Sequence, residues 1–296
     1  MHRSLIAALL LAAAVPAAAQ LKPTNADDAF KMNTKIICST KAGEWSVFYW
    51  EGTVYSRIRG EKDRHLFDVK AMSMRQCQPF TDPVKGVGSR SVNREIMFYT
   101  DPETGEVLRT WKNPWSGETV DVMHVHNDPV NSREPSWSRN ADGTPRAKFE
   151  HLVKDGYMYQ GGGAALLFYD NPLAGDYQDF VGNKYQTTEF LTAVVPMKVL
   201  TDPKTTRSND TVISWGRVSR WMPWMKMGGR DGVLVHYTGG LRLNSFEDLP
   251  EWMKKEVRAN YPAYVAPPPT DDKRPNETSW TVFKRLTDAK RAAEKK

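Results

Sequence analysis

Short stretches rich in aromatic and β-branched residues recur along most of the chain, and turn residues separate them. This pattern predicts β-strands rather than helices. Near the start, strands are expected at 45–50 and 53–59, with Gly52 as a break between them. Further strands are expected at 148–153, 157–160, 164–169, 187–195, 211–220, 232–238 and 241–243. Such a series of short strands favours a barrel or sandwich over α/β units.

Residues 94–126 predict a meander of three antiparallel strands, at 94–99, 106–111 and 118–126. Each connection places a proline near its start and a glycine at its end, as in the turns that end at Gly105 and Gly117. Proline fixes φ near the value that begins a tight turn, and glycine tolerates the positive φ that ends it.

Helical periodicity is confined to the two ends. Asn25 is suited to cap a helix over 25–37, and Ser245 to cap one that continues through Val257. A proline-rich segment at 262–275 leads to a last amphipathic helix, with Val282, Phe283, Leu286, Ala289 and Ala293 on its apolar face. We therefore expect a mainly β fold. It comprises a single antiparallel barrel, lipocalin-like or open, over 20–260, and a proline-rich linker with a basic helix over 261–296.

Residues 1–19 have the three parts of a cleavable export signal. Arg3 is followed by an apolar run from Leu5 to Val15 and by small residues at 17–19. The run is shorter than the about 20 residues that a membrane span needs, so an uncleaved anchor is the weaker alternative. The mature protein is expected in the periplasm or secreted, without a membrane span.

The formal net charge of +6 does not indicate nucleic-acid binding, because much of the excess lies at one end. Residues 284–296 hold six basic and two acidic residues, and a charged terminal segment is usually only solvated. Cys38 and Cys77 make an even cysteine count in an exported chain, which suggests a disulfide. Two buried free thiols are the alternative.

Two stretches carry a resemblance to a known family. One runs from Arg94 through Trp111 to the His124–Asn131 segment, and the other from Trp221 through His236 to Pro250. Together they resemble the bacterial and fungal family defined by domain of unknown function 1838, over most of the mature chain. The resemblance implies membership of a family of exported proteins and implies no activity.

Side-chain alternation places His124 and His126 on the same face of one predicted strand as Val120 and Val122. Because that face is apolar, the imidazoles are expected to face inward. Two histidines at this spacing can chelate a metal, but the sequence lacks the flanking Gly and Glu of a cupin. Hydrogen-bonded core histidines and acid–base groups are the other interpretations. Asp128 could orient an imidazole, although Asn-Asp-Pro is also ordinary turn chemistry.

Residues 215–227 combine tryptophan and methionine with basic residues. They could form an adaptable apolar rim over a binding site, or a corner of the core packed with large side chains. The glycines at 161–163 lack the Walker spacing, and a bend between two strands is the expected explanation.

These observations lead to one functional hypothesis. The barrel binds a small apolar or aromatic molecule and transfers a proton to or from it without a cofactor, as a lyase, isomerase or hydratase does. A non-catalytic carrier and a carbohydrate-active enzyme are the alternatives. No metal is assigned. The predicted catalytic residues are His124, His126, Asp128 and His236. The predicted substrate-binding residues are Trp111, Arg217, Trp221, Trp224, Met227 and Tyr237.

Overall fold

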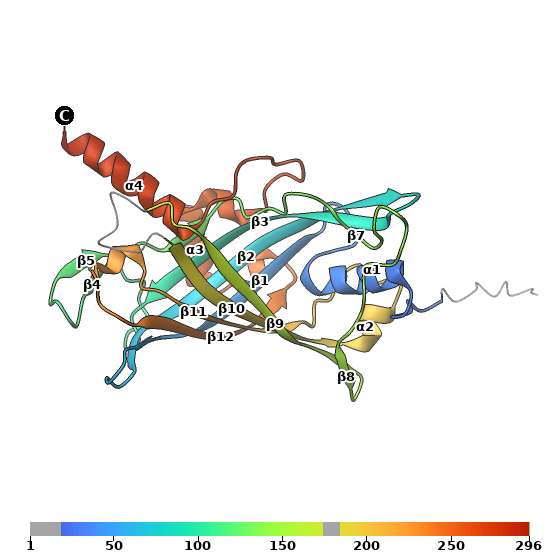
Figure 1. Ribbon diagram of the computed structural model, residues 1–296, viewed down its shortest axis with the longest axis horizontal. Coiled ribbons are helices and arrows are strands. Elements are labelled where there is room, and N and C mark those ends of the chain that lie inside the picture. The colour runs from blue at the N-terminus through green and yellow to red at the C-terminus, as the bar shows by residue number, and fades with distance from the viewer. Residues whose placement is uncertain (1–18, 174–183, 296) are drawn as a thin grey trace, which may run out of the picture.

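The computed structural model describes residues 19–173 and 184–295, so the expected export signal lies almost wholly outside the described residues. Most of the described chain forms one antiparallel sheet of ten strands, in the order β6-β3-β2-β1-β12-β11-β10-β9-β8, with β7 also paired to β3 (Figure 1). The strands are β1 (Trp45–Arg57), β2 (Arg64–Asp82), β3 (Gly86–Thr100), β6 (Val125–Asn127), β7 (Ser136–Trp137), β8 (Leu152–Lys154), β9 (Tyr157–Asp170), β10 (Lys184–Pro196), β11 (Val212–Ser219) and β12 (Val233–Leu243). A separate two-stranded sheet holds β4 (Thr110–Lys112) and β5 (Thr119–Asp121).

The sheet curls strongly, so that β9 and β10 lie across from β1–β3 (Figure 1). We call the face that the curl encloses the inner face. Within the described residues no pairing joins the edge strands β6 and β8, so the barrel is not closed. The expectation of a mainly β, antiparallel fold with helices at both ends is confirmed, whereas the closed form of the barrel is not found.

Two apolar clusters fill the ends of the inner face. At one end Met32 and Ile36 of α1 (Ala26–Ile37) pack against Phe48 and Ile213. At the other end the segment 221–227, which includes the 3-10 helix η1 (Pro223–Met225), packs against Phe67 and Val54. Between these two clusters, the middle of the inner face carries charged and polar side chains.

Helices cover the outer face of β1–β3. Val47, Met72 and Phe98 point outward there, and they pack against α3 (Glu251–Asn260) and against residues of η2 (Phe246–Asp248) and η3 (Pro262–Val265). Alternation along each strand therefore sends one set of residues inward and the next set under these helices.

The C-terminal helix α4 (Ser279–Glu294) is packed onto the sheet at its N-terminal end. Trp280 is 1% exposed and lies 4.5 Å, between ring centroids, from Tyr185 of β10. Glu277, two residues before α4, donates its backbone N–H to the carbonyl oxygen of Pro129, just after β6. The start of α4 thus connects strands from both sides of the open sheet.

Local signals were accurate in several places. Asn25 caps α1 by accepting hydrogen bonds from the backbone of Asp27 and Asp28. Gly105 and Gly117 have φ of 73° and 74°, as the turn sequences predict. Cys38 and Cys77 form the expected disulfide, with Cα atoms 6.1 Å apart, and it joins the end of α1 to β2. Among the described helices, none is long and apolar enough to cross a membrane.

Several predicted strand boundaries were wrong. Gly52 does not interrupt β1; a Cβ there would lie 2.1 Å from the carbonyl oxygen of Tyr237 on β12, so glycine allows the close approach of two strands. The glycines at 161–163 lie inside the continuous strand β9, opposite a register shift in β10, rather than at a bend. The predicted meander is replaced by the small β4–β5 sheet and by β6, which pairs with β3. The 19-residue strand β2 was not predicted. The helix α2 (Met197–Thr201) was also missed.

Candidate functional site

Charged side chains lie on the inner face between the two apolar ends. The pairing register places Arg75 and Glu95 on this face from β2 and β3, and Glu189 and Arg217 from β10 and β11. Each of these side chains is only partly accessible to solvent. We call these four residues the charged centre. It holds two positive and two negative groups, so its formal charges balance.

Arg217 has the most contacts in the charged centre. Its guanidinium lies 3.5 Å from the Glu189 carboxylate and donates hydrogen bonds to the hydroxyls of Tyr185 and Thr187. Burial by itself lowers the pKa of Arg217, but Tyr185 and Glu189 outweigh that effect and raise it. Arg217 therefore stays charged and anchors this side of the inner face.

Glu95 is the carboxyl of the charged centre that lies on the opposite side of the curl from Arg217. Burial raises its pKa and the charge of Glu189 adds to this, while Arg75 and Arg217 oppose it. β3 and β11 are four strand positions apart in the sheet, which is about 19 Å along a flat sheet. The electrostatic interaction between Glu95 and Arg217 therefore reflects the curl that brings the two sides together.

A chain of hydrogen bonds holds Glu95 in place. Ser73 donates to the side-chain oxygen of Asn93 at 2.7 Å, and the Asn93 amide donates to Glu95 at 2.6 Å. All three side chains share the inner face of β2 and β3. One carboxylate oxygen is thus fixed, which orients the group without pairing it directly with an arginine.

Around the charged centre, several buried polar atoms have no hydrogen-bond partner among the described residues. The pairing register places eight such atoms on the inner face, from seven different strands. They are Trp50 Nε1, Arg75 Nε, Tyr99 Oη, Asn127 Oδ1, Gln160 Oε1, Ser219 Oγ, His236 Nδ1 and Arg242 Nε. Buried polar groups in folded proteins are nearly always paired, so this grouping is unusual.

His236 is a neutral histidine in this setting. It is 3% exposed, and burial, together with the charge of Arg217, lowers its pKa to about 3. Its ring packs edge-on against Trp215 at 5.6 Å. A neutral imidazole can donate or accept one hydrogen bond through Nδ1, depending on its tautomer.

Aromatic rings flank the charged centre. Trp50 and Trp215 lie 6.4 Å apart across β12, and the fully buried Tyr99 lies toward the end filled by 221–227, 5.4 Å from Trp224. The inner face therefore combines flat apolar surfaces with charged and hydrogen-bonding groups.

A comparison with protein families shows the family to which this chain belongs. The model of the family described as protein of unknown function, DUF1838, matches residues 43–287. The chain belongs to the DUF1838 family. The match includes nearly all of the curled sheet and the start of α4, and it confirms the resemblance seen in the sequence.

The other comparisons add little about this DUF1838 protein. The curated proteins gave no match. Among solved structures, the crystal structure of a LolA superfamily protein from Nitrosomonas europaea matches 78% of this chain and 97% of its own, at 10% sequence identity and a TM-score of 0.18. That score is too low to establish a shared fold.

The predicted catalytic histidines do not converge. His126 pairs with Ile96 in register, which places it on the outer face, where its ring contacts Tyr261. His124 packs against the outward-facing Phe98, 5.3 Å away. His236 lies on the inner face of β12, on the other side of the sheet from His126. His124 lies at the edge of β3, where its ring also stacks on Tyr99 at 6.2 Å. The structure therefore does not bring the three histidines together.

His124, His126 and Asp128 have structural partners. His124 accepts a hydrogen bond from the backbone N–H of Tyr99 at 3.1 Å, and burial lowers its pKa to about 4. Burial also lowers the pKa of His126. Asp128 forms ion pairs with Arg94 at 2.8 Å and Arg274 at 2.7 Å. The contacts of Asp128 hold the proline-rich segment against β3. His124 is tied to β3 through Nδ1, while its buried Nε2 has no hydrogen-bond partner among the described residues.

The predicted binding residues are divided among three locations. Only Arg217 belongs to the charged centre. The side chains of Trp111, Trp221, Trp224 and Met227 lie in the apolar core at one end of the inner face, each less than 10% exposed, so the segment 221–227 is core rather than a rim. Tyr237 points away from the inner face and is 73% exposed.

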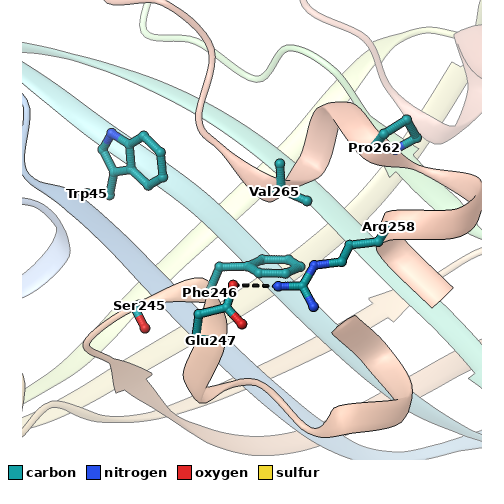
Figure 2. Close-up of a pocket in the computed structure, with 7 residues that line it drawn as sticks. All are labelled: Trp45, Ser245, Phe246, Glu247, Arg258, Pro262 and Val265. Atoms are coloured by element: carbon teal, nitrogen blue, oxygen red, sulfur yellow. Dashed lines mark hydrogen bonds and ion pairs between the residues drawn. The ribbon is translucent and has the colours of Figure 1, made fainter. Parts of the chain in front are cut away.

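Hollows on the surface of the described residues include two that could hold a small molecule. One of about 540 Å³ is lined by Trp45, Phe246, Val265 and the ion pair of Arg258 with Glu247 (Figure 2). The other, of about 610 Å³, lies beside Trp111. In the first hollow Arg258 is already neutralised by Glu247 at 2.5 Å, so it offers no uncompensated charge to a ligand. Among the described residues no cluster of three or more His, Cys, Asp or Glu is arranged to hold a metal.

Sequence reasoning missed most of the charged centre. Arg75 lies on the unpredicted strand β2. Glu95 lies in a stretch that was used only for the family resemblance, and Glu189 and Trp50 lie on predicted strands to which no role was given. One signal was available: Ser73 and Arg75, and Asn93 and Glu95, put polar residues at alternate positions inside aromatic and apolar stretches.

Proposed function

We propose that this protein binds a small, partly apolar or aromatic molecule on the inner face of its curled sheet. The observation that carries the proposal is the set of unpaired buried polar atoms around the charged centre. Each unpaired buried group costs about 1–3 kcal/mol, and a molecule that pairs several of them recovers that cost on binding. The tryptophans Trp50 and Trp215 supply flat apolar surface beside the polar groups.

The experiment that tests binding compares what co-purifies with three forms of the protein. We expect the wild-type protein, purified from its own host, to carry about one small molecule per chain. Native mass spectrometry detects this molecule, and extraction allows it to be identified. Trp215→Leu removes one inner-face ring and should lose it. Trp45→Leu is the matched control, because Trp45 is 41% exposed and lies away from the inner face. A compound retained equally by all three forms, or found with none, contradicts the proposal.

A second candidate function is cofactor-free proton transfer to the bound molecule. The observation that favours it is Glu95, a buried carboxyl whose pKa is raised and which faces the same space as Arg217. A general acid or base works best with a pKa near the operating pH. His236 is the one predicted catalytic histidine on this face, and its low pKa suits hydrogen bonding rather than acid catalysis.

Turnover of the co-purified compound tests this second function. With that compound as substrate, Glu95→Gln should lower the rate by about 10²–10⁴-fold while binding persists. Product formation followed by NMR, with equal rates for wild type and Glu95→Gln, would exclude Glu95 as the proton-transfer group.

We also propose export from the cytoplasm, on the basis of residues 1–19. Protein from the periplasmic fraction should have an intact mass that lacks about the first 19 residues. Full-length protein confined to the cytoplasm would contradict export.

A further inference from the structure

We infer that the molecule bound on the inner face is a neutral ring that carries several hydroxyl groups. This inference rests on the proposed function and specifies its ligand class. It follows from which groups are unpaired, from their charge and from the rings beside them, all of which belong to described residues.

The unpaired atoms offer donors and acceptors in similar measure. Trp50 Nε1 and Arg75 Nε can only donate, and the Tyr99 hydroxyl can do both. Asn127 Oδ1 and Gln160 Oε1 can only accept. A ligand with acceptors alone, such as a ketone or ether, leaves the amide oxygens unpaired. A hydroxyl group is both donor and acceptor, so several hydroxyls on one scaffold match both kinds of atom.

Charge selects a neutral ligand. Each arginine of the charged centre has a carboxyl group near it, Glu95 for Arg75 and Glu189 for Arg217, and Arg217 already pairs with Glu189 at 3.5 Å. An anionic ligand near Arg75 would face the Glu95 carboxylate, and a cationic one would face Arg217. Burying an uncompensated charge is costly, so a group without charge is favoured in this space.

The neighbouring rings favour a cyclic scaffold. Trp50 and Trp215 lie beside the polar atoms, and their faces suit flat contact with another ring. An aliphatic chain would bury its length against the charged centre and pair none of these groups. Both a phenolic ring and a sugar ring have the required chemistry, and they are distinguished by experiment.

The test uses matched probes with the full-length mature protein. Catechol is compared with its dimethyl ether, and methyl β-glucopyranoside with its fully O-methylated form; benzoate and laurate represent anionic and aliphatic ligands. Binding is measured by ligand-observed NMR at millimolar concentration. We expect at least one hydroxylated ring to bind about 10-fold or more tightly than its ether, and the stronger of the two identifies a phenolic or a saturated ring.

The variant Tyr99→Phe removes a single unpaired hydroxyl. It should weaken binding of the preferred hydroxylated probe about 5- to 10-fold, as the loss of one hydrogen bond does, and leave the midpoint of urea unfolding unchanged or higher. Tyr237→Phe is the matched control, because Tyr237 is exposed on the outer face, and it should change neither quantity.

The outcomes separate this inference from the proposed function. If an ether, benzoate or laurate binds at least as well as the hydroxylated rings and Trp215→Leu abolishes that binding, the inner face is a binding site but the inferred ligand class is wrong. If no probe binds and the wild-type protein carries no compound from its host, both fail. If Tyr99→Phe leaves the affinity for the hydroxylated probe unchanged, the assignment of that hydroxyl is overturned.

Discussion

The surroundings of a residue in this protein depend on the face of the sheet to which its side chain points. His126 and Asn127 are neighbours in sequence, yet the first contacts Tyr261 under the outer helices and the second belongs to the inner face. The same holds for His236 and Tyr237, of which one is 3% and the other 73% exposed. Residue type alone therefore did not identify the site, and the direction of each side chain did.

His236 gives a prediction for stability against pH. In the folded protein its pKa is lowered from the ordinary value of 6.5 to about 3, because the ring is buried and lies near Arg217. Below about pH 6.5 the unfolded chain therefore binds a proton that the folded protein excludes. Its contribution to stability is present above that pH and is lost as the pH falls, by up to about 1.4 kcal/mol per pH unit.

Urea unfolding at pH 7, 6 and 5 measures this loss. The free energy of unfolding of wild type should fall more steeply with decreasing pH than that of His236→Gln, which cannot titrate. Parallel profiles for the two proteins would show that the histidine is accessible to protons in the folded state.

At the scale of elements, close strand packing decides where glycine is required. Gly52 and Gly240 lie where β1 and β12 approach closely, and a Cβ at either position would meet a backbone oxygen at 2.1 Å. Gly239 lies beside them in β12, and a Cβ there would have no heavy atom within 4 Å. The three glycines are indistinguishable by sequence pattern but differ in their surroundings.

We expect Gly52→Ala to destabilise the protein by about 1–3 kcal/mol, because the added methyl group forces two strands apart. Gly239→Ala should change stability by less than about 0.5 kcal/mol. The free energies of unfolding in urea provide the comparison. Equal effects of the two substitutions would mean that the approach of β1 and β12 does not depend on Gly52.

At the scale of the whole molecule, the C-terminal segment belongs to the fold. The helix α4 was expected to follow a linker as a solvated basic helix, with Leu286 on its apolar face. Val282 of the predicted apolar face is buried, as is Trp280, which was not predicted, while Leu286 is 43% exposed. Because Trp280 contacts Tyr185, and Tyr185 accepts a hydrogen bond from Arg217, α4 supports the charged centre from behind.

Trp280→Ala should therefore lower the free energy of unfolding by about 3–5 kcal/mol, as the loss of a buried tryptophan does. Leu286→Ala on the same helix is the control and should have an effect below about 0.5 kcal/mol. Thermal and urea unfolding monitored by circular dichroism measure both. If Trp280→Ala is as stable as wild type, α4 is only an appendage.

The sequence by itself determined the features that depend on residues close together in the chain. Asn25 caps its helix, Gly105 and Gly117 end their turns, and the strand-rich pattern indicates a mainly β chain, because capping, φ preference and side-chain alternation act over a few residues. Even the pairing of Cys38 with Cys77 followed from a count of two.

Only the tertiary structure decided which strands are neighbours and how far the sheet curls. Glu95 and Arg217 are 122 positions apart in the sequence and four strand positions apart in the sheet, so no local pattern brings them together. A shift of one residue in register sends every side chain of a strand to the other face, which is why His124 and His126 could not be placed from alternation alone. The charged centre exists because long strands pair in one register and curl until their inner faces meet.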